Sequence, residues 1–422
     1  NTTWKNLKKL YLLINKIGYT GAEALSKNET WVNLEELLLI DNEIGDLGIK
    51  VIAQNTAWKK LKRLNLGGNQ IGDAGAVAFG KNESWDNLEE LMLGGNQIGD
   101  LGIKAIAQNT TWKNLKKLYL ARNQIRDAGA EVLGKNETWA KLEVLSLGSN
   151  QIGDAGIQGI AQNTSWKNPK WLGLIRNQIG DTGAVALGMN SSWVNLTHLD
   201  LSKTNIGIEG GKAIGSNAVW THLQEVNLSE NSIGDEGAAA IGRNTTWVNL
   251  VRLDISDNNI TDKGAIVIGN NTVWTKLQIL SMLSNEVGVD GCAAIAKNPT
   301  WSNLQELNLS KNQIKNEGAR YLGKNVVWTK LTYLYLSSNQ IGDEGATAIA
   351  TNQGWTNLTK LYLALNPIGY KGGLALGRNT SWKELEKIEL SYKELRTEER
   401  NALKSNLLFG SKISFFRIRA HS

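Results

Sequence analysis

Tryptophan recurs along this chain with a fixed period. Fifteen tryptophans, from Trp4 to Trp382, follow one another at a constant interval of 27 residues, with no insertion between them. A column of asparagines from Asn1 to Asn379 and a column of glycines from Gly21 to Gly372 keep the same interval. A fixed period of this length indicates one structural unit that is stacked about fifteen times.

Each unit is predicted to contain a short strand and a short helix. In the first unit the strand pattern is L-x-x-L-x-L-x-x-N-x-I, formed by Leu7, Leu10, Leu12, Asn15 and Ile17. The alternation of apolar and other residues is typical of a strand with one buried face. The pattern G-D-x-G-A-x-x-I that follows predicts a helix, with the aspartate as its N-terminal cap. These aspartates are Asp46, Asp73, Asp100, Asp127, Asp154, Asp181, Asp235, Asp262 and Asp343. The asparagine column follows each helix, and we expect a left-handed backbone there.

The two kinds of element need different spacings when they stack. Neighbouring strands lie about 4.8 Å apart, whereas packed helices need about 8 to 10 Å, so a stack of strand–helix units must bend. We therefore expect an α/β solenoid shaped as a curved horseshoe, with a parallel β-sheet on its concave face and short helices on its convex face.

The recurring motif resembles the ribonuclease-inhibitor-like class of leucine-rich repeats. The resemblance covers residues 1 to about 390 and implies a horseshoe fold with a protein-binding concave or rim surface, without naming the partner. In that family the asparagine after each strand bonds to backbone groups of the turn. Here Thr204 replaces it in one unit. The tryptophan column is a second departure, which we interpret as a buried aromatic spine.

The predicted domain organisation is a single array with a terminal cap. Residues 1–390 form about 14 to 15 units of 27 residues, and residues 391–422 form a degenerate C-terminal capping repeat. In that repeat Leu395, Leu403, Asn406 and Phe409 keep the frame, while residues 397–400 are strongly polar, as a cap requires. At the start, Asn1 opens on a unit without a cap, so we expect a missing N-terminal cap or a longer parent chain. An exposed strand edge there could support edge-to-edge self-association.

Charge and composition exclude several classes of partner. The chain has 46 basic and 40 acidic side chains spread along its length, which argues against a nucleic-acid-binding protein. It contains no apolar run of the roughly 18 residues that a membrane span needs, so we expect no membrane insertion. The single cysteine, Cys292, favours the cytoplasm or delivery to a host cytosol over an extracellular location. Sequons such as Asn136-Glu137-Thr138 fall in a repeat corner and are interpreted as structural.

The sequence offers little chemistry for catalysis. The three histidines are His198, His222 and His421, and Cys292 occupies a column otherwise filled by alanines such as Ala238. We interpret Cys292 as a small buried residue. The chain contains no phosphate-binding loop motif. We therefore expect no enzymatic activity, no cofactor and no metal site.

The outward strand positions predict where a partner binds. In the first units charged pairs alternate in sign, from Lys8-Lys9 to Glu35-Glu36 and Lys62-Arg63, and we expect them to neutralise one another along the sheet. The alternation breaks at the seventh unit, where Pro169 replaces a leucine and Trp171 faces outward. Tryptophan and arginine are favoured at interface hot spots. The predicted binding residues are Trp171, Arg176, Tyr119, Arg122, His198, Asp200, Lys203, Glu225, Arg252 and Asp254.

Two alternatives stay open for these surfaces. Trp171 could instead be an exposed residue without a role that arose as the repeats diverged, or it could rest against Arg122 or Arg176 as a cation–π contact. A second patch, Tyr333, Tyr335 and Tyr362 with Lys360, is the fallback binding surface, although its tyrosines could equally be a cross-strand packing pair.

The function predicted from these features is a protein-binding scaffold that uses its concave face. One alternative is the ligand-sensing region of an innate-immune-type receptor or a fragment of a bacterial effector. Another is a structural or engineered array without a dedicated partner, because units such as residues 58–70 and 85–97 are nearly identical. Ribonuclease inhibition would need a strongly acidic face, whereas the net charge of this chain is +6.

Overall fold

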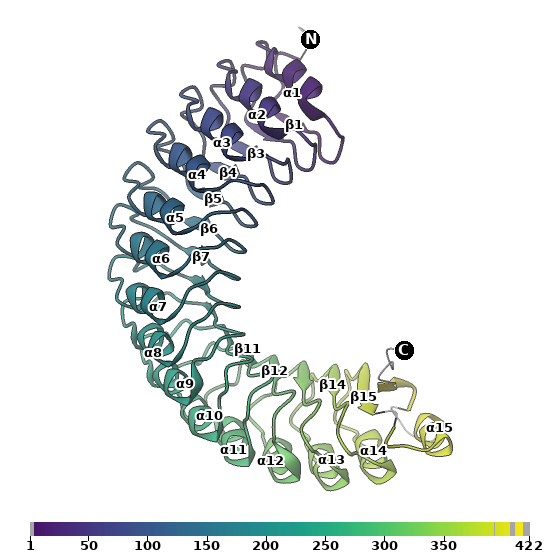
Figure 1. The fold of residues 1–422 in the computed structure, drawn as a ribbon. Coiled ribbons are helices and arrows are strands. Elements are labelled where there is room, and N and C mark those ends of the chain that lie inside the picture. Colours follow the sequence, from purple (N-terminus) through teal and green to yellow (C-terminus); the bar gives the residue numbers. More distant parts are fainter. Residues whose placement is uncertain (1–3, 392, 406–409, 417–422) are drawn as a thin grey trace. The chain divides into compact units, whose positions relative to one another are not determined.

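The computed structural model describes residues 4–391, 393–405 and 410–416. Asn1, Asn406, Phe409 and His421 lie outside the described residues. The chain divides into two compact parts, residues 1–205 and 206–422, which we call the first and the second unit. Each 27-residue segment of the sequence is called a repeat. Both consist of the same repeat, one strand followed by one helix, and within each unit the strands pair in parallel and in sequence order (Figure 1). The expected solenoid of strand–helix repeats is therefore confirmed.

Within its described residues, 4–205, the first unit contains eight strands and seven helices. The strands are β1 (Lys9–Tyr11), β2 (Glu36–Leu38), β3 (Arg63–Asn65), β4 (Glu90–Met92), β5 (Lys117–Tyr119), β6 (Val144–Ser146), β7 (Trp171–Gly173) and β8 (His198–Asp200). The helices are α1 (Gly18–Ser26), α2 (Gly45–Ala53), α3 (Asp73–Gly80), α4 (Asp100–Ala107), α5 (Asp127–Gly134), α6 (Asp154–Ala161) and α7 (Asp181–Gly188).

The second unit begins with a helix and ends on a strand that the repeat pattern does not predict. Its strands are β9 (Glu225–Asn227), β10 (Arg252–Asp254), β11 (Ile279–Ser281), β12 (Glu306–Asn308), β13 (Tyr333–Tyr335), β14 (Lys360–Tyr362), β15 (Lys387–Ser391) and β16 (Ile413–Phe416). Its helices are α8 (Ile208–Ser216), α9 (Gly234–Arg243), α10 (Asp262–Gly269), α11 (Val289–Lys297), α12 (Lys315–Gly323), α13 (Asp343–Ala350), α14 (Tyr370–Gly377), α15 (Thr397–Ser405) and the 3-10 turn η1 (Gly410–Lys412).

The register of the sheet follows the 27-residue period. Leu10 pairs with Leu37, and Leu37 pairs with Leu64, so equivalent residues of successive repeats stand side by side. In each unit the helices cover one side of the sheet, which we call the helix face, and the other side is the strand face (Figure 1). The side chains of the repeat leucines lie in the core between the sheet and the helices. They are buried from the second repeat onward, as Leu37 and Leu64 show.

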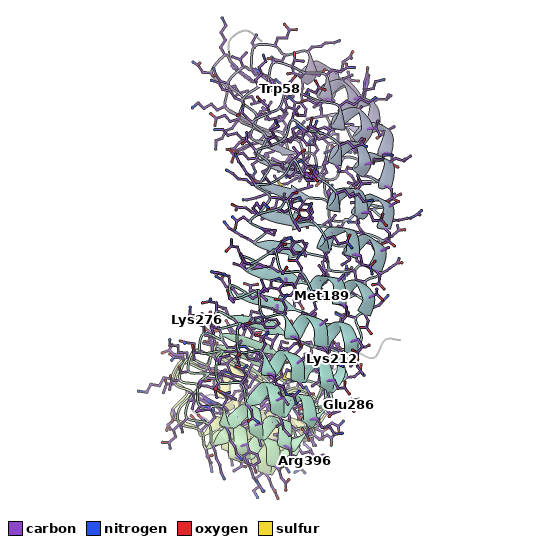
Figure 2. All side chains as sticks on the ribbon, turned by 90° about the vertical axis from the view of Figure 1, so that its left-hand side faces the viewer. Trp58, Met189, Lys212, Lys276, Glu286 and Arg396 are labelled. Carbon is purple, nitrogen blue, oxygen red and sulfur yellow. The ribbon has the colours of Figure 1, made fainter. Side chains whose placement is uncertain are left out.

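The tryptophan column forms the predicted spine inside each unit. Trp58 and Trp85 are fully buried, and their ring centroids lie 6.3 Å apart with the planes 15° from parallel. Figure 2 labels Trp58 inside the first unit and Met189 at its exposed surface on the helix face. Within the described residues the buried indole N–H groups, including those of Trp58 and Trp85, have no hydrogen-bond acceptor. Tryptophan is therefore used here for its size and shape rather than for its polar group.

The aspartate column caps helices, but not the helices that contain it. Oδ1 of Asp73, the first residue of α3, accepts hydrogen bonds from the backbone N–H groups of Gly99 (2.7 Å) and Gly102 (2.8 Å), where α4 begins. The prediction of a cap for its own helix was wrong, because Asp73 already lies inside that helix while the free N–H groups of the next helix face it. Asp100, Asp127, Asp154, Asp235, Asp262 and Asp343 make the same pair of bonds.

The asparagine after each helix also joins neighbouring repeats. Nδ2 of Asn109 donates to the carbonyls of Gly80 (2.9 Å) and Asn82 (2.7 Å), and its Oδ1 accepts from the N–H of Trp112 (3.3 Å). The expected left-handed backbone is wrong at this column, since φ is −68° at Asn244. Asn244 keeps an ordinary backbone conformation, and its side-chain amide bonds to the carbonyls of Gly215 and Asn217 in the preceding repeat. Because Nδ2 of Asn136 is likewise bonded to Ala107 (2.7 Å), the structural interpretation of these sequons is confirmed.

The asparagine after each strand behaves as the family resemblance implies. Nδ2 of Asn123 donates to the carbonyls of Leu93 and Leu120, both at 3.0 Å, and its Oδ1 accepts from the N–H of Ile98 at 3.0 Å. At the exceptional position, Oγ1 of Thr204 donates to the carbonyl of Leu201 at 2.8 Å. Left-handed residues occur on both sides of this column, immediately before it at Arg122 (φ 57°) and immediately after it at Gln70 (φ 58°).

Candidate functional site

The strand face of β1 to β6 carries a self-paired lattice of charges. Nζ of Lys62 lies 2.9 Å from Glu35 on the neighbouring repeat, and Lys9 lies 2.6 Å from Glu36. Further pairs along the sheet join Lys8 to Glu35, Arg63 to Glu90, Lys116 to Glu89, and Lys170 to Glu143. The hydrogen bond from Lys62 holds the pKa of Glu35 below its usual range. The predicted neutralisation of this surface is confirmed.

Trp171, at the start of β7, does not project freely from the strand face. Its indole lies against Gly173, two residues further along the strand, where an added Cβ would overlap the ring. The other side of the ring stays partly exposed. Beneath it, Pro169 and Trp166 border a small cavity of about 10 Å³. The structure shows no cation–π contact of Trp171 with Arg122 or Arg176, so that alternative is wrong: the ring packs on the glycine instead.

The two predicted arginines share one column of the strand face, with Arg176 in the same repeat as Trp171 and Arg122 two repeats earlier. Arg122 and Arg176 immediately precede the asparagine that follows each strand, and their backbones are left-handed, with φ of 57° and 56°. Both side chains are exposed, and neither forms an ion pair with a described residue. Lys203 follows in the same column, half-buried, with φ of 55°. Arg122 and Arg176 therefore differ from the self-paired lattice beside them.

Three further predicted residues lie on neighbouring strands of the first unit. Tyr119 ends β5 and is half-buried, which raises the pKa of its phenol. His198 pairs with Trp171 across the sheet, and its Nδ1 lies 2.8 Å from Oγ1 of Thr197. Asp200 accepts hydrogen bonds from the N–H (3.0 Å) and the hydroxyl (2.6 Å) of Ser202. Asp200 therefore serves the turn that follows β8.

The remaining predicted residues belong to the second unit. Glu225 starts β9 and pairs with Arg252 of β10 across the sheet. Arg252 lies 3.6 Å from Asp254 on its own strand, and Asp254 also accepts hydrogen bonds from Ser256. The structure thus groups seven of the ten predicted residues in the first unit and three in the second.

The fallback patch is a packed aromatic stack. Tyr335 and Tyr362, partners across β13 and β14, stack with ring centroids 4.7 Å apart and planes 6° from parallel. Lys387 lies over the outer ring, 4.9 Å from the centroid of Tyr362, and Lys360 lies 5.5 Å from that of Tyr333. Burial raises the pKa of Tyr335 to about 12. The cross-strand packing interpretation is confirmed, because the facing surfaces of the stacked rings are already covered.

Sequence reasoning missed one apolar feature near this stack. Leu365 is 44% exposed and Phe416 is 41% exposed, and together with Pro367 they border a cavity of about 270 Å³. Leu365 occupies the column that holds Arg122 in the first unit, so aligning that column would have found it. Phe416 lies on β16, outside the repeat pattern, and gave no such signal.

Cys292 is fully buried in the alanine column, as predicted, and burial raises the pKa of its thiol. Among the described residues no three His, Cys, Asp or Glu side chains gather as a metal site would require. No helix in the described ranges combines the length and apolar character needed to cross a bilayer.

These features define a repeat protein whose strand face presents side chains outward while its polar ladders join the repeats. The family described as "Leucine Rich repeat" matches eleven segments that make up more than half of the chain. They are residues 59–80, 87–107, 113–134, 140–161, 174–188, 194–215, 221–242, 248–269, 302–323, 329–350 and 356–377. The chain belongs to the leucine-rich-repeat family; its ribonuclease-inhibitor-like class stays a prediction.

Solved structures share the fold at low sequence identity. An internalin of Listeria monocytogenes is 22% identical, with a TM-score of 0.62 over 90% of this chain and 97% of its own. A leucine-rich-repeat protein of Leptospira interrogans is 20% identical, with a TM-score of 0.59 over 98% and 94%. The plant peptide hormone receptor RGFR1, solved with RGF2, is 19% identical, with a TM-score of 0.51; the match covers 92% of this chain and 56% of the receptor chain. No curated protein matches the chain in sequence.

Proposed function

We propose that this chain is a protein-recognition scaffold that holds its partner on the strand face of the first unit, over β5 to β8. One observation carries the proposal. Most charged side chains on the preceding strands are paired with each other, whereas the exposed Arg122 and Arg176 form no ion pair with any described residue. A partly exposed tryptophan, Trp171, lies between them in chain order.

The chemistry of this surface supports protein binding. Truncating a buried tryptophan or arginine at an interface commonly costs about 2 kcal/mol or more, on the order of a thirtyfold change in affinity. The solved receptor RGFR1 is in complex with RGF2, so a related fold is compatible with a peptide-sized partner. Sensing by a receptor-type or effector-type protein is the narrower form of the same proposal. A cytoplasmic or host-cytosol location rests on the single buried thiol of Cys292.

Affinity capture with a matched pair of double variants tests the proposal. Three proteins are immobilised in parallel and exposed to cell lysate. They are the intact chain, the strand-face variant Trp171→Ala with Arg176→Ala, and the control variant Tyr370→Ala with Arg320→Ala. The control removes an exposed aromatic and an exposed arginine from helices instead of the strand face. All three proteins must first show the same melting temperature.

A protein retained by the intact chain and the control, but lost from the strand-face variant, is the expected result. Equal retention by all three chains would place the partner elsewhere and contradict the proposal. Failure to retain any protein specifically would favour a repeat array without a dedicated partner.

A further inference from the structure

Two glycines at outward positions shape the surface around Trp171. An added Cβ on Gly173 would overlap the indole of Trp171, and an added Cβ on Gly148 would lie 2.6 Å from Cγ2 of Ile175. The side chains of Trp171 and Ile175 therefore occupy space that the side chain of any other residue at positions 173 and 148 would fill. Trp171 and Ile175 lie down against β6, β7 and the turns that follow, and both stay partly exposed. They form a low apolar floor.

Two arginines whose positive charges are not paired with a carboxylate of a described residue lie beside this floor. Arg122 and Arg176 are exposed, two repeats apart in one column, with Ser149 between them. Neither arginine forms an ion pair with a described residue, and Glu143 on the same face is already paired with Lys170 at 3.1 Å. Guanidinium groups match carboxylates with two parallel hydrogen bonds. The flank therefore suits negative charge brought by a partner.

We propose that an extended acidic segment of a protein partner crosses this floor, with apolar side chains against Trp171 and Ile175 and carboxylates on Arg122 and Arg176. The inference rests on the proposed function and names the chemistry of the partner. Strands lie about 4.8 Å apart, so the two arginines are separated by on the order of 10 Å. An extended chain advances about 3.3 Å per residue, so acidic residues about three apart would match them.

A nucleic acid fits this surface less well than an acidic peptide. Nucleic-acid binding rests on many phosphate contacts, commonly about six to ten for a specific site. In the first unit the column supplies only Arg122 and Arg176 as exposed cations without an ion pair to a described residue, while lysines of the neighbouring lattice, such as Lys62 and Lys116, are paired with Glu35 and Glu89. Few cations beside an apolar floor favour carboxylates carried on a polypeptide.

Defined probes test the inference on the full chain. Fluorescence anisotropy would measure binding of a labelled 12-residue peptide that repeats Glu-Ser-Leu, of analogues with Gln or Lys for Glu, and of a 12-residue deoxythymidine oligonucleotide. The peptide with Glu should bind at least about tenfold more tightly than the Gln analogue, with affinity falling as NaCl rises. Arg122→Gln with Arg176→Gln should weaken its binding by about tenfold or more.

The matched control removes two charges that are already compensated. Lys62→Gln with Lys116→Gln also lowers the net charge by two, and it should leave the affinity within about twofold, since both lysines are paired with glutamates. Equal loss in the two double variants would show a diffuse charge effect and overturn the inference. Absence of binding by every peptide would also overturn it, as would tighter binding of the oligonucleotide with the same dependence on the arginines.

The proposed function can survive these failures. A protein captured through Trp171 whose affinity is unchanged by Arg122→Gln with Arg176→Gln, and by salt, would overturn the acidic segment while keeping the strand-face scaffold. Loss of Trp171-dependent capture would contradict the scaffold itself.

Discussion

Gly173 determines where the indole of Trp171 lies. Gly173→Ala should lift the ring off β7, because the new methyl group would overlap it. Acrylamide quenching of tryptophan fluorescence should increase, since spine tryptophans such as Trp58 are fully buried and the exposed Trp4 contributes equally in both proteins. The same change in a Trp171→Phe background should leave quenching unaltered. If the single Ala variant quenches like the parent chain, the ring does not depend on this glycine.

At this scale the sequence predicted positions better than orientations. The two-residue alternation along the strand was enough to place Trp171 on the outward surface, and the sign pattern of Glu35 and Lys62 was enough to pair them. The orientation of the indole could not be predicted, because it depends on a missing side chain at Gly173. The absence of an ion pair at Arg176 could not be predicted either, because it depends on which partners the carboxylates of neighbouring repeats bind.

Helix starts are stabilised across repeats rather than within one. Asp73→Ala should lower the free energy of unfolding by about 1 to 2 kcal/mol, because the N–H groups of Gly99 and Gly102 lose their acceptor. Asp73→Asn should cost less than half of that. The chain itself supplies the precedent, since Asn316 accepts from Gly342 and Gly345 in the same way. Denaturant unfolding of both variants measures the difference, and equal losses would show that the charge rather than the acceptor matters.

The lattice of charges should make stability depend on acid pH. The pKa values of Glu35 and Glu36 are lowered from the ordinary value of 4.5, mainly by hydrogen bonds from Lys62 and Lys9. Their ionised forms therefore stabilise the fold above about pH 4.5, and this contribution is lost as the pH falls through the lowered values. Glu35→Gln with Glu36→Gln should flatten the decline of stability below about pH 4.5 at low salt.

Denaturant unfolding at a series of pH values, repeated in high salt, checks this. Salt should reduce the difference between the parent and the variant, because the pairs are exposed to solvent. Parallel pH profiles at low salt would contradict the contribution of these carboxylates.

Element types followed from the sequence, whereas the bonds between elements did not. A period of two residues in the strand and the G-D-x-G-A pattern of the helix were sufficient to place one of each in every repeat. The partner of Asp73 could not be deduced, because a cap for its own helix and a cap for the next use the same residues. The register of 27 residues, seen in the pairing of Leu10 with Leu37, decides between them.

For the whole molecule, we propose that residues 1–390 act as a repeat array and residues 391–422 as its C-terminal cap. Leu403 on α15 is fully buried while Glu398 on the same helix is exposed, which fits a terminal repeat with a polar outer side. β16 covers the edge of β15 by pairing Ile413 with Ile388. The fold of the array was predictable because each repeat buries its core only against its neighbours. A correct interpretation of one repeat therefore predicts the fold of the others.

For a protein that consists of residues 1–422 alone, we propose that two copies meet at the β1 edge of the sheet. Among the described residues β1 pairs with β2 alone, and Tyr11 and Ile14 beside this edge are 49% and 76% exposed. Open strand edges with apolar side chains favour pairing with a second chain. We expect the mass measured by sedimentation to rise with concentration, and Ile14→Lys to suppress that rise. Val326→Lys, at a residue that is also 76% exposed, is the control and should leave it unchanged. A constant monomer mass at all concentrations would show that this edge stays unpaired in solution.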